Sequence, residues 1–402
     1  MGFFQQRRNN MDSEQILVSE AAQLDDLAPL RVPAFAKALD DLDDLLTQNS
    51  KAFLIGAGCS KCAGLPLMEE LTKKTLASTK LSTTTKSILS VIERLFAGAN
   101  TANIEDYLSE LVDLVAIAER RGIRGATSQM ATLGGVDYTA EKLKDSVDEI
   151  KSAIVEVIDV PVSMEVHLKF IQAIHRPSRP GRMVATRPVD YLLLNYDALI
   201  ESALALQKLR YADGMNGGST AWWDLSTFNA EGLSARVIKL HGSIDWKEMS
   251  GQPLPRRVEK NLNLPTGIEQ KVLIWPASTK YRETQRDPYA QLSSLARSAL
   301  RPPSGCQTVL TICGYSFGDS HINIEIEQAL RESKGELTLV VFTFDEEPVG
   351  FLKKLHEDKA ISDQIRIYAR KGFFHGSTVF KSEEDLPWYK FENITRIMGG
   401  ER

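Results

Sequence analysis

Four short polar clusters could carry chemistry, and each follows an apolar run of strand length. They are Gly56-Ala57-Gly58-Cys59-Ser60, Asn195-Tyr196-Asp197, His241-Gly242-Ser243 and Gly314-Tyr315-Ser316-Phe317-Gly318-Asp319. In an open α/β sheet the carboxyl ends of the strands converge on one crevice, and ligands bind there. We therefore expect the four clusters to face a single ligand.

The first cluster is a glycine loop suited to an anion. Gly56, Ala57 and Gly58 end a strand-like run, so the backbone can turn tightly and approach a diphosphate, while the following helix offers its N–H groups. Lys61 stands where a dinucleotide-binding dehydrogenase has its third glycine, and no P-loop pattern lies nearby. Taken alone, the loop also fits a tight turn without a ligand.

The elements that must position these clusters are alternating strands and helices. Apolar residues recur with a helical period between about residues 82 and 175, which predicts a helical insertion. Outside it, runs that are apolar on both faces alternate with helical patterns, which predicts a parallel sheet covered on both faces. The strand-like runs are Ala52–Ile55, Val189–Leu194, Val237–Leu240, Val272–Trp275, Thr308–Cys313, Leu337–Phe344 and Ile365–Ala369.

The predicted fold is thus α/β, with a Rossmann-like parallel sheet, helices on both faces and an inserted helical subdomain. We expect an N-terminal arm over residues 1–33, which is a candidate oligomerisation segment. The nucleotide-binding domain is predicted over 34–81 and 176–402, and the helical insertion over 82–175.

Composition excludes several classes of protein. Hydrophobic residues make up 43% of the chain and charged residues 25%, as in an ordinary globular protein. The net charge is −5, from 48 Lys and Arg against 53 Asp and Glu, so direct nucleic-acid binding is not indicated. No apolar run reaches the roughly 20 residues of a membrane span, and the first eight residues lack the apolar core of a signal peptide. We expect a cytoplasmic protein with no membrane partner.

The cysteines do not predict a zinc site. Cys59 and Cys62 form a C-x-x-C pair, but Cys306 and Cys313 are spaced too widely to complete a zinc ribbon. No zinc is therefore expected.

The four clusters, in their order along the chain, resemble the sirtuin-like family, specifically its zinc-free bacterial branch. Gly56–Ser60 followed by Gly64-Leu65-Pro66 is similar to the family loop that folds over the diphosphate and nicotinamide ribose of NAD. Asn195-Tyr196-Asp197 resembles its Asn-(Ile/Tyr)-Asp element, and Lys239–Ser243 its catalytic strand end. Gly314–Ser316 stands where the family contacts the adenosine half. The resemblance covers most of the chain after residue 50.

The resemblance implies that NAD+ is the substrate and is cleaved between nicotinamide and ribose, through a transition state with oxocarbenium character. His241 would act as general base on a ribose hydroxyl, while Asn195 would hold that ribose or position the attacking water. The residues implied in binding the dinucleotide are Gly56, Ala57, Gly58, Ser60, Asp197, Gly314 and Ser316.

Structural alternatives stay open for these polar residues. His241 also fits a hydrogen-bonded polar residue at a strand end. Asp197 fits a cap of the helix that begins near Ala198, and we favour that role over catalysis. Ser60 fits a helix cap as well as it fits a ribose or phosphate ligand.

Three functions follow from the resemblance. Leu67-Met68 occupies the place of the Phe-Arg pair of lysine deacylases, and the zinc ribbon is missing, which disfavours deacylation. The segment Asn103–Leu108 resembles one found in sirtuin-like effectors of bacterial antiphage defence, which hydrolyse NAD+ to nicotinamide and ADP-ribose. We therefore predict an NAD+ glycohydrolase effector. The alternatives are an NAD-dependent protein deacylase and a non-catalytic sensor of NAD or an ADP-ribose derivative.

A freely active enzyme of this kind would poison its host, so its activity must be gated. The arm and the insertion are candidate interfaces for that gating. The size of the chain resembles family members that work with a separately encoded HerA-type hexameric ATPase. We therefore expect a homo-oligomer with a HerA-type partner.

Overall fold

The computed structural model describes residues 26–48, 50–96, 102–175, 187–259, 270–274, 287–302 and 305–401. Most of the predicted arm over residues 1–33 lies outside this range. Its last part packs into the core: Leu27, which precedes the 3-10 helix η1 (Ala28–Arg31), and Leu30 within that helix are each 2% exposed.

A nine-stranded sheet forms the centre of the molecule, in the order β16-β15-β14-β13-β12-β1-β4-β8-β5. All neighbours from β14 to β5 pair in parallel, while β15 and β16 add an antiparallel hairpin at one edge. The predicted Rossmann-like α/β class is confirmed. The strands are β1 (Ser50–Ile55), β4 (Val189–Leu193), β5 (Tyr211–Ala212), β8 (Ala235–Lys239), β12 (Thr308–Cys313), β13 (Leu337–Phe342), β14 (Ile365–Ala369), β15 (Gly372–His375) and β16 (Thr378–Lys381).

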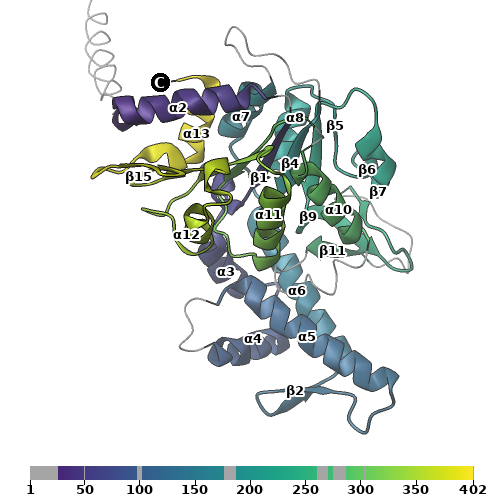
Figure 1. Cartoon of the computed structure of the whole chain (residues 1–402). Helices are drawn as coiled ribbons and strands as arrows, with labels where there is room; N and C mark the ends of the chain where they lie inside the picture. Colours follow the sequence, from purple (N-terminus) through teal and green to yellow (C-terminus); the bar gives the residue numbers. More distant parts are fainter. Residues whose placement is uncertain are drawn as a thin grey trace, which may run out of the picture.

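The parallel strands are apolar on both faces because helices cover both. In β1, Phe53 and Ile55 point into one core cluster and Ala52 and Leu54 into the other, as the two-residue period of a strand requires. Figure 1 shows the two helical layers. The first contains α2 (Pro33–Leu46), α7 (Glu165–His175), α8 (Leu199–Leu206) and α13 (Phe391–Gly399), and the second α10 (Tyr289–Leu300), α11 (Ser320–Glu332) and α12 (Gly350–Glu357).

A second, antiparallel sheet packs beside the second layer and corrects one prediction. We expected the run at 272–275 in the parallel sheet, but β11 (Gln270–Ile274) pairs antiparallel with β9 instead. The order is β11-β9-β10-β7-β6. A four-residue apolar run does not specify its partner strand, which is why the sequence pattern placed it wrongly. The other strands are β6 (Met215–Gly217), β7 (Ala221–Trp223), β9 (Gly242–Met249) and β10 (Arg256–Arg257).

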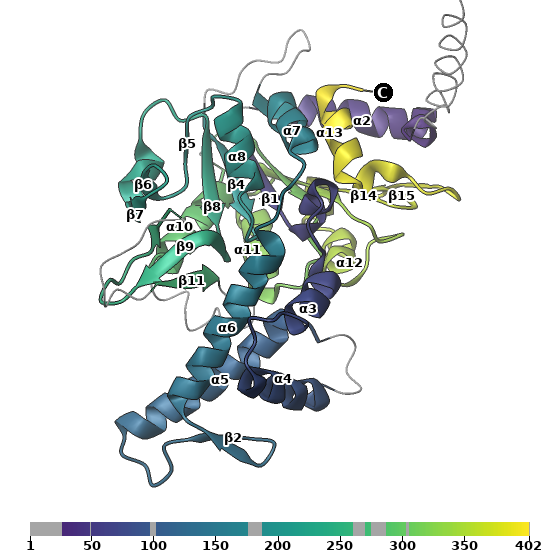
Figure 2. The same cartoon turned by 180° about the vertical axis from the view of Figure 1, so that it is seen from behind.

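The helical insertion projects from the sheet domain as a stalk, visible from both sides in Figures 1 and 2. The helix α3 at its base packs against α5 and α6, whereas α7 packs against α13 of the sheet domain. The helices at the two predicted domain boundaries therefore pack across them. The elements are α3 (Met68–Leu76), α4 (Thr83–Leu95), α5 (Ile104–Ile123), α6 (Ala140–Ile158) and the hairpin β2 (Ala131–Leu133) and β3 (Val136–Tyr138).

The described residues also contain short 3-10 helices. They are η2 (Ala57–Ala63), η3 (Leu225–Asn229), η5 (Ser362–Gln364) and η6 (Pro387–Tyr389). The element that directly follows the glycine turn after β1 is thus η2, and α3 begins only after it.

Replacing Phe53 tests the first core layer. Its ring is 0% exposed and lies 5.4 Å from the Phe170 ring and 5.5 Å from the Tyr191 ring, between centroids. Phe53→Ala should lower the free energy of unfolding by about 3–5 kcal/mol in urea denaturation, because it leaves a cavity. The control Leu206→Ala, at a side chain that is 60% exposed, should cost less than about 0.5 kcal/mol. Equal losses would contradict the assigned core.

Candidate functional site

The four polar clusters follow four neighbouring strands that end at the same level. In the order β12-β1-β4-β8, the last residues Cys313, Ile55, Leu193 and Lys239 are paired in register. Each cluster therefore begins at the same edge of the sheet, as the sequence predicts. The sheet thus brings together, at one edge, chain segments that are far apart in the sequence.

The glycines of this edge are required because two loops cross in close contact. Gly58 N donates to Gly314 O at 3.0 Å, and Gly56 N donates to Cys313 O at 3.0 Å. A Cβ on Gly56 would lie 2.4 Å from Gly314 O, and a Cβ on Gly314, where φ is +64°, would lie 2.5 Å from Cys59 N. The close approach that selects glycine at Gly56 and Gly314 is therefore made by the opposite loop. The loop crossing fixes the glycine loop of β1 against the end of β12.

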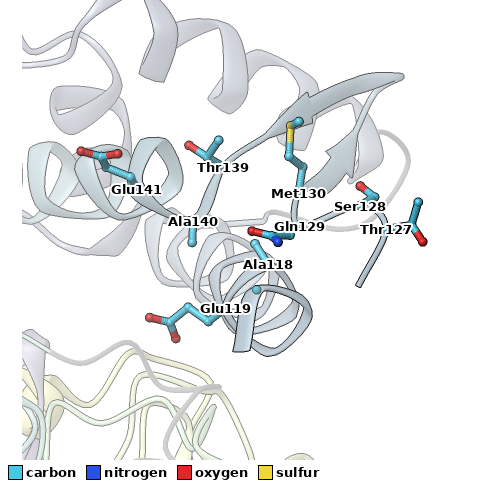
Figure 3. Close-up of a pocket in the computed structure, with 10 residues that line it drawn as sticks. Ala118, Glu119, Thr127, Ser128, Gln129, Met130, Thr139, Ala140 and Glu141 are labelled. Carbon is cyan, nitrogen blue, oxygen red and sulfur yellow. The ribbon is translucent and has the colours of Figure 1, made fainter. Parts of the chain in front are cut away.

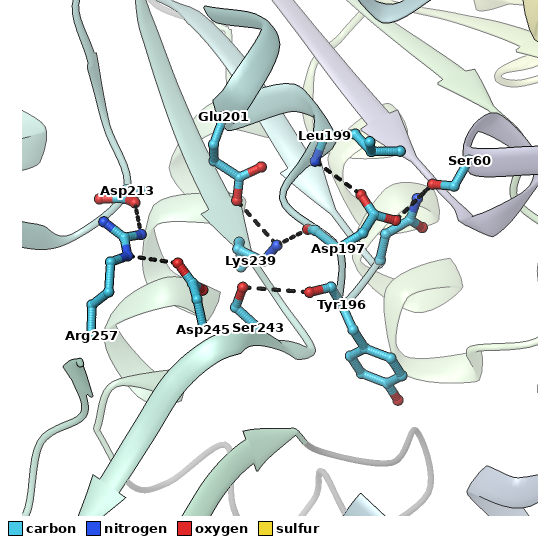
Figure 4. A network of polar contacts seen from close by, with 11 residues as sticks. Ser60, Tyr196, Asp197, Leu199, Glu201, Asp213, Lys239, Ser243, Asp245 and Arg257 are labelled. Carbon is cyan, nitrogen blue, oxygen red and sulfur yellow. Dashed lines mark hydrogen bonds and ion pairs between the residues drawn. The ribbon is translucent and has the colours of Figure 1, made fainter. Parts of the chain in front are cut away.

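Ser60 joins two of the clusters. Its hydroxyl accepts a hydrogen bond from Asn195 Nδ2 at 2.7 Å and donates one to Asp197 Oδ2 at 2.7 Å. The other carboxylate oxygen, Asp197 Oδ1, accepts from Leu199 N at 3.2 Å, where α8 begins. Asp197 thus takes the helix-start contact and also holds Ser60. Figure 4 shows this network.

The side-chain oxygen of Asn195 is a hydrogen-bond acceptor that this network does not use. It is 8% exposed, and within the described part of the chain its Oδ1 atom has no hydrogen-bond partner. Buried polar atoms are nearly always paired, so an unpaired carbonyl at a strand edge marks a place for a donor from a ligand or water. Asn195 can therefore accept a hydrogen bond from a hydroxyl group.

A buried ion pair fixes the backbone at Asp197. Lys239 is 1% exposed, lies 3.1 Å from Glu201 Oε1, and donates through Nζ to the backbone carbonyl of Asp197. Burial raises the pKa of Glu201, while Lys239 acts in the opposite direction. A lysine at the end of β8 thereby fixes the backbone on which the Asp197 carboxylate is carried.

A second ionic group lies beside this pair, on the antiparallel sheet. Arg257 donates to Asp213 at 2.5 Å and to Asp245 at 2.6 Å. Burial tends to raise the pKa of Asp245, but Arg257 and Lys239 outweigh it, so the pKa is lowered. This arginine ties β10 to the start of β9, directly after the His241 turn (Figure 4).

His241 lies next to a carboxylate that sequence reasoning did not select. Its Nε2 atom is 3.4 Å from Asp319 Oδ2, and the two residues are 3% and 8% exposed. Tyr196, on the neighbouring strand end, has its ring centroid 6.4 Å from that of His241. A histidine beside a carboxylate has a fixed ring orientation, which suits it to proton transfer.

The structure brings most of the predicted site residues together. Ser60, Asn195 and Asp197 share hydrogen bonds, Gly56, Gly58 and Gly314 share the loop crossing, and His241 stands on the adjacent strand end. Ala57 and Ser316 are exposed on the same two loops.

Four polar residues of the site were missed from the sequence. Asp319 had a signal, because it ends the cluster that begins at Gly314. Lys239 stands two residues before His241 within a strand. Glu105 lies within the segment Asn103–Leu108, which was selected only for its resemblance, and its contact with Tyr196 gave no signal in the sequence. Glu201 gave no signal, because it lies on a helix whose partner strand only the fold identifies.

The structure also has a pocket far from this sheet edge. A surface pocket of about 580 Å³ lies at the far end of the stalk, between α5, the β2 hairpin and the start of α6 (Figure 3). Its lining includes none of the predicted site residues.

Within the described segments, no group of three or more His, Cys, Asp and Glu side chains is arranged to hold a metal ion. No helix in that part of the chain is long and apolar enough to cross a bilayer.

A comparison with known families finds a match to part of the chain. Residues 191–364 match the family model described as a SIR2-like domain. The matched range contains Asn195, Asp197, His241 and Ser316, whereas Gly56–Ser60 precede it.

Several solved structures are similar to the chain. One is a Sir2 homologue in complex with NAD, with 12% identity and a TM-score of 0.38 over 90% of this chain and 95% of that one. Two others are Sir2 homologue mutants, histidine to asparagine and phenylalanine to alanine, each in complex with ADP-ribose. They are 10% and 11% identical, each with a TM-score of 0.38 over 89% of this chain, and 94% and 95% of their own chains are covered. A comparison with curated proteins finds no match.

The loop crossing predicts a large cost for a methyl group at Gly314. Gly314→Ala should destabilise the chain by about 1–3 kcal/mol more than Gly125→Ala in urea denaturation, because of overpacking against Cys59. Gly125 has the same φ of +64° but nothing within 4 Å of a Cβ, so it reports the backbone strain alone. Equal costs at the two positions would show that the crossing is not tight.

The buried ion pair predicts a loss that a second substitution restores. Lys239→Met should lower the free energy of unfolding by about 3–5 kcal/mol, because Glu201 is left buried without its partner. The double variant Lys239→Met/Glu201→Leu should recover at least half of this loss, since no buried charge remains. A double variant no more stable than Lys239→Met would contradict the pairing.

Proposed function

We propose that the chain is an NAD+ glycohydrolase, which cleaves NAD+ to nicotinamide and ADP-ribose. The observation that carries the proposal is the Ser60–Asn195–Asp197 network beside His241, at strand ends that are in register. The resemblance of the four clusters to the sirtuin-like family supports NAD+ as the substrate. The two crossing glycine loops would hold the dinucleotide along the sheet edge, through Gly56, Ala57, Gly58, Gly314 and Ser316.

In this proposal the bond between the nicotinamide nitrogen and the ribose C1′ breaks, and water attacks the carbon. The unpaired Oδ1 of Asn195 would accept a hydrogen bond from a ribose hydroxyl or from that water. His241 would take a proton from a ribose hydroxyl as positive charge develops on the ring. The proton that the attacking water loses would return to that ribose oxygen, and His241 would release its proton to solvent, so that the reaction yields nicotinamide, ADP-ribose and one proton. Asp319 Oδ2, at 3.4 Å from His241 Nε2, would orient the imidazole ring for this transfer and stabilise its protonated form.

Ser60 has a positioning role in this proposal. Because its hydroxyl proton is already donated to Asp197, it orients the Asn195 amide toward the substrate. Asp197 in turn anchors Ser60 and the start of α8. A hydrogen-bonded support of this kind holds a reacting group in its productive orientation.

We further propose that the enzyme is gated and acts in bacterial antiphage defence in the cytoplasm, where NAD+ depletion halts the infected cell. Asn195 and His241 are only 8% and 3% exposed, so substrate reaches them after neighbouring segments move. Assembly into a homo-oligomer with a HerA-type hexameric ATPase is the proposed trigger. In this proposal the complex cleaves NAD+, whereas the isolated chain is inactive.

Substitution of the two central residues tests the enzymatic proposal. Asn195→Ala and His241→Ala should each lower nicotinamide release by about 10²–10⁴-fold, the range of general acid–base effects, in the assembly with a HerA-type ATPase. Release is measured chromatographically from NAD+. The control variants Asn216→Ala and His356→Ala, which alter the same residue types away from the strand edge, should retain wild-type release.

Three outcomes would contradict the proposal. Wild-type release by either site variant would remove these residues from the reaction. Binding of NAD+ by the wild-type assembly without any release would instead favour a sensor. Release that requires an acetyl-lysine peptide would favour a deacylase.

A further inference from the structure

We propose that Glu105, on helix α5 of the stalk, is a positioning residue for the strand-edge site and acts through Tyr196. The inference rests on the proposed function for its catalytic consequence. The structural link is direct, because Tyr196 OH donates to Glu105 Oε1 at 2.6 Å across a separation of 91 residues. Tyr196 stands between Asn195 and Asp197, the two residues that bind Ser60.

The stalk end of this link is rigid. Helix α5 begins with a capping box, in which Asn103 Oδ1 accepts from Glu105 N at 2.8 Å and Asp106 Oδ2 accepts from Asn103 N at 2.8 Å. Ile104 N donates to Thr72 Oγ1 at 3.0 Å, which ties the first turn to α3. Glu105 is therefore carried by a turn whose backbone is fixed on both sides.

The site end of the link is equally fixed. Tyr196 is 6% exposed, and its backbone oxygen accepts hydrogen bonds from Ile244 N at 3.0 Å and Ser243 Oγ at 3.4 Å. It therefore connects the Asn195 strand end to the turn that carries His241. In Figure 4 its side chain extends away from Ser60 and Asp197. Burial, followed by the nearby Glu105 carboxylate, raises the pKa of Tyr196, so the phenol stays protonated and donates.

A second contact brings the stalk to the other side of the same turn. Asp148 of α6 forms an ion pair with Lys271 of β11 at 2.7 Å, and β11 pairs with β9, which begins at Gly242. The stalk thus touches both the Asn195 strand end and the strand that follows His241. A displacement of α5 relative to the sheet shifts Tyr196 and alters the separation of Asn195 and His241. The proposed assembly would act on the site through the stalk.

Hydrogen exchange on the full chain tests the link without relying on catalysis. Tyr196→Phe and Glu105→Leu each remove one partner of the hydrogen bond and should speed exchange of the Ile244 and Leu199 amides by about tenfold or more. The conservative variant Glu105→Gln keeps an acceptor and should exchange at a rate closer to wild type. Glu119→Gln, which breaks an ion pair with Lys144 inside the stalk, is the matched control and should leave both amides unchanged.

Kinetics of the assembly then separate positioning from folding. Tyr196→Phe and Glu105→Leu should lower kcat by about tenfold or more while KM changes less than about twofold, and the double variant should be no worse than either single variant. Wild-type exchange at both amides in both variants would overturn the proposal. Additive losses of kcat would also overturn it. If the wild-type assembly releases no nicotinamide, the proposed function fails, and the exchange result alone decides the coupling.

Discussion

The crossing of two glycine loops at the carboxyl edge of the sheet is the constraint on which the site depends. Gly56 and Gly58 follow β1, Gly314 follows β12, and their backbones approach so closely that neither loop accommodates a Cβ. This contact fixes the position of Ser60, which in turn holds Asn195 and Asp197. The backbone contact between the loops after β1 and β12 thus fixes the side chains of Asn195 and Asp197, which follow a third strand, β4.

Charged side chains support the same edge, and they are buried at Lys239 and Glu201 and partly buried at Arg257 and Asp245. Lys239 binds the Asp197 carbonyl and pairs with Glu201, while Arg257 holds Asp213 and Asp245 beside the His241 turn. Buried ion pairs contribute little net stability compared with well-packed apolar residues, and their attested value is in specifying one arrangement. We infer that these pairs are present to fix the strand ends in one geometry, as a site of this kind requires.

The sequence could predict where the strands end and which polar residues follow them. The bounds of β12 and β14 match the predicted runs, because both strands are buried almost throughout and are therefore mostly apolar. The partner of β11 could not be predicted, since a short apolar run fits either sheet. Asp319 and Glu105 lie in segments that the sequence singled out, but their contacts could not be predicted. Asp319 contacts His241 and Glu105 contacts Tyr196, and both contacts depend on how α11 and α5 pack.

The central claim is that NAD+ binds at the edge formed by β12, β1, β4 and β8, with its nicotinamide ribose at Asn195. A crystal structure of the His241→Ala variant grown with NAD+ tests it most directly, because the substitution slows turnover. The account predicts an intact dinucleotide along the two glycine loops, with a ribose hydroxyl or an ordered water bonded to Asn195 Oδ1. A dinucleotide bound elsewhere on the chain, with Asn195 Oδ1 still unpaired, would contradict it.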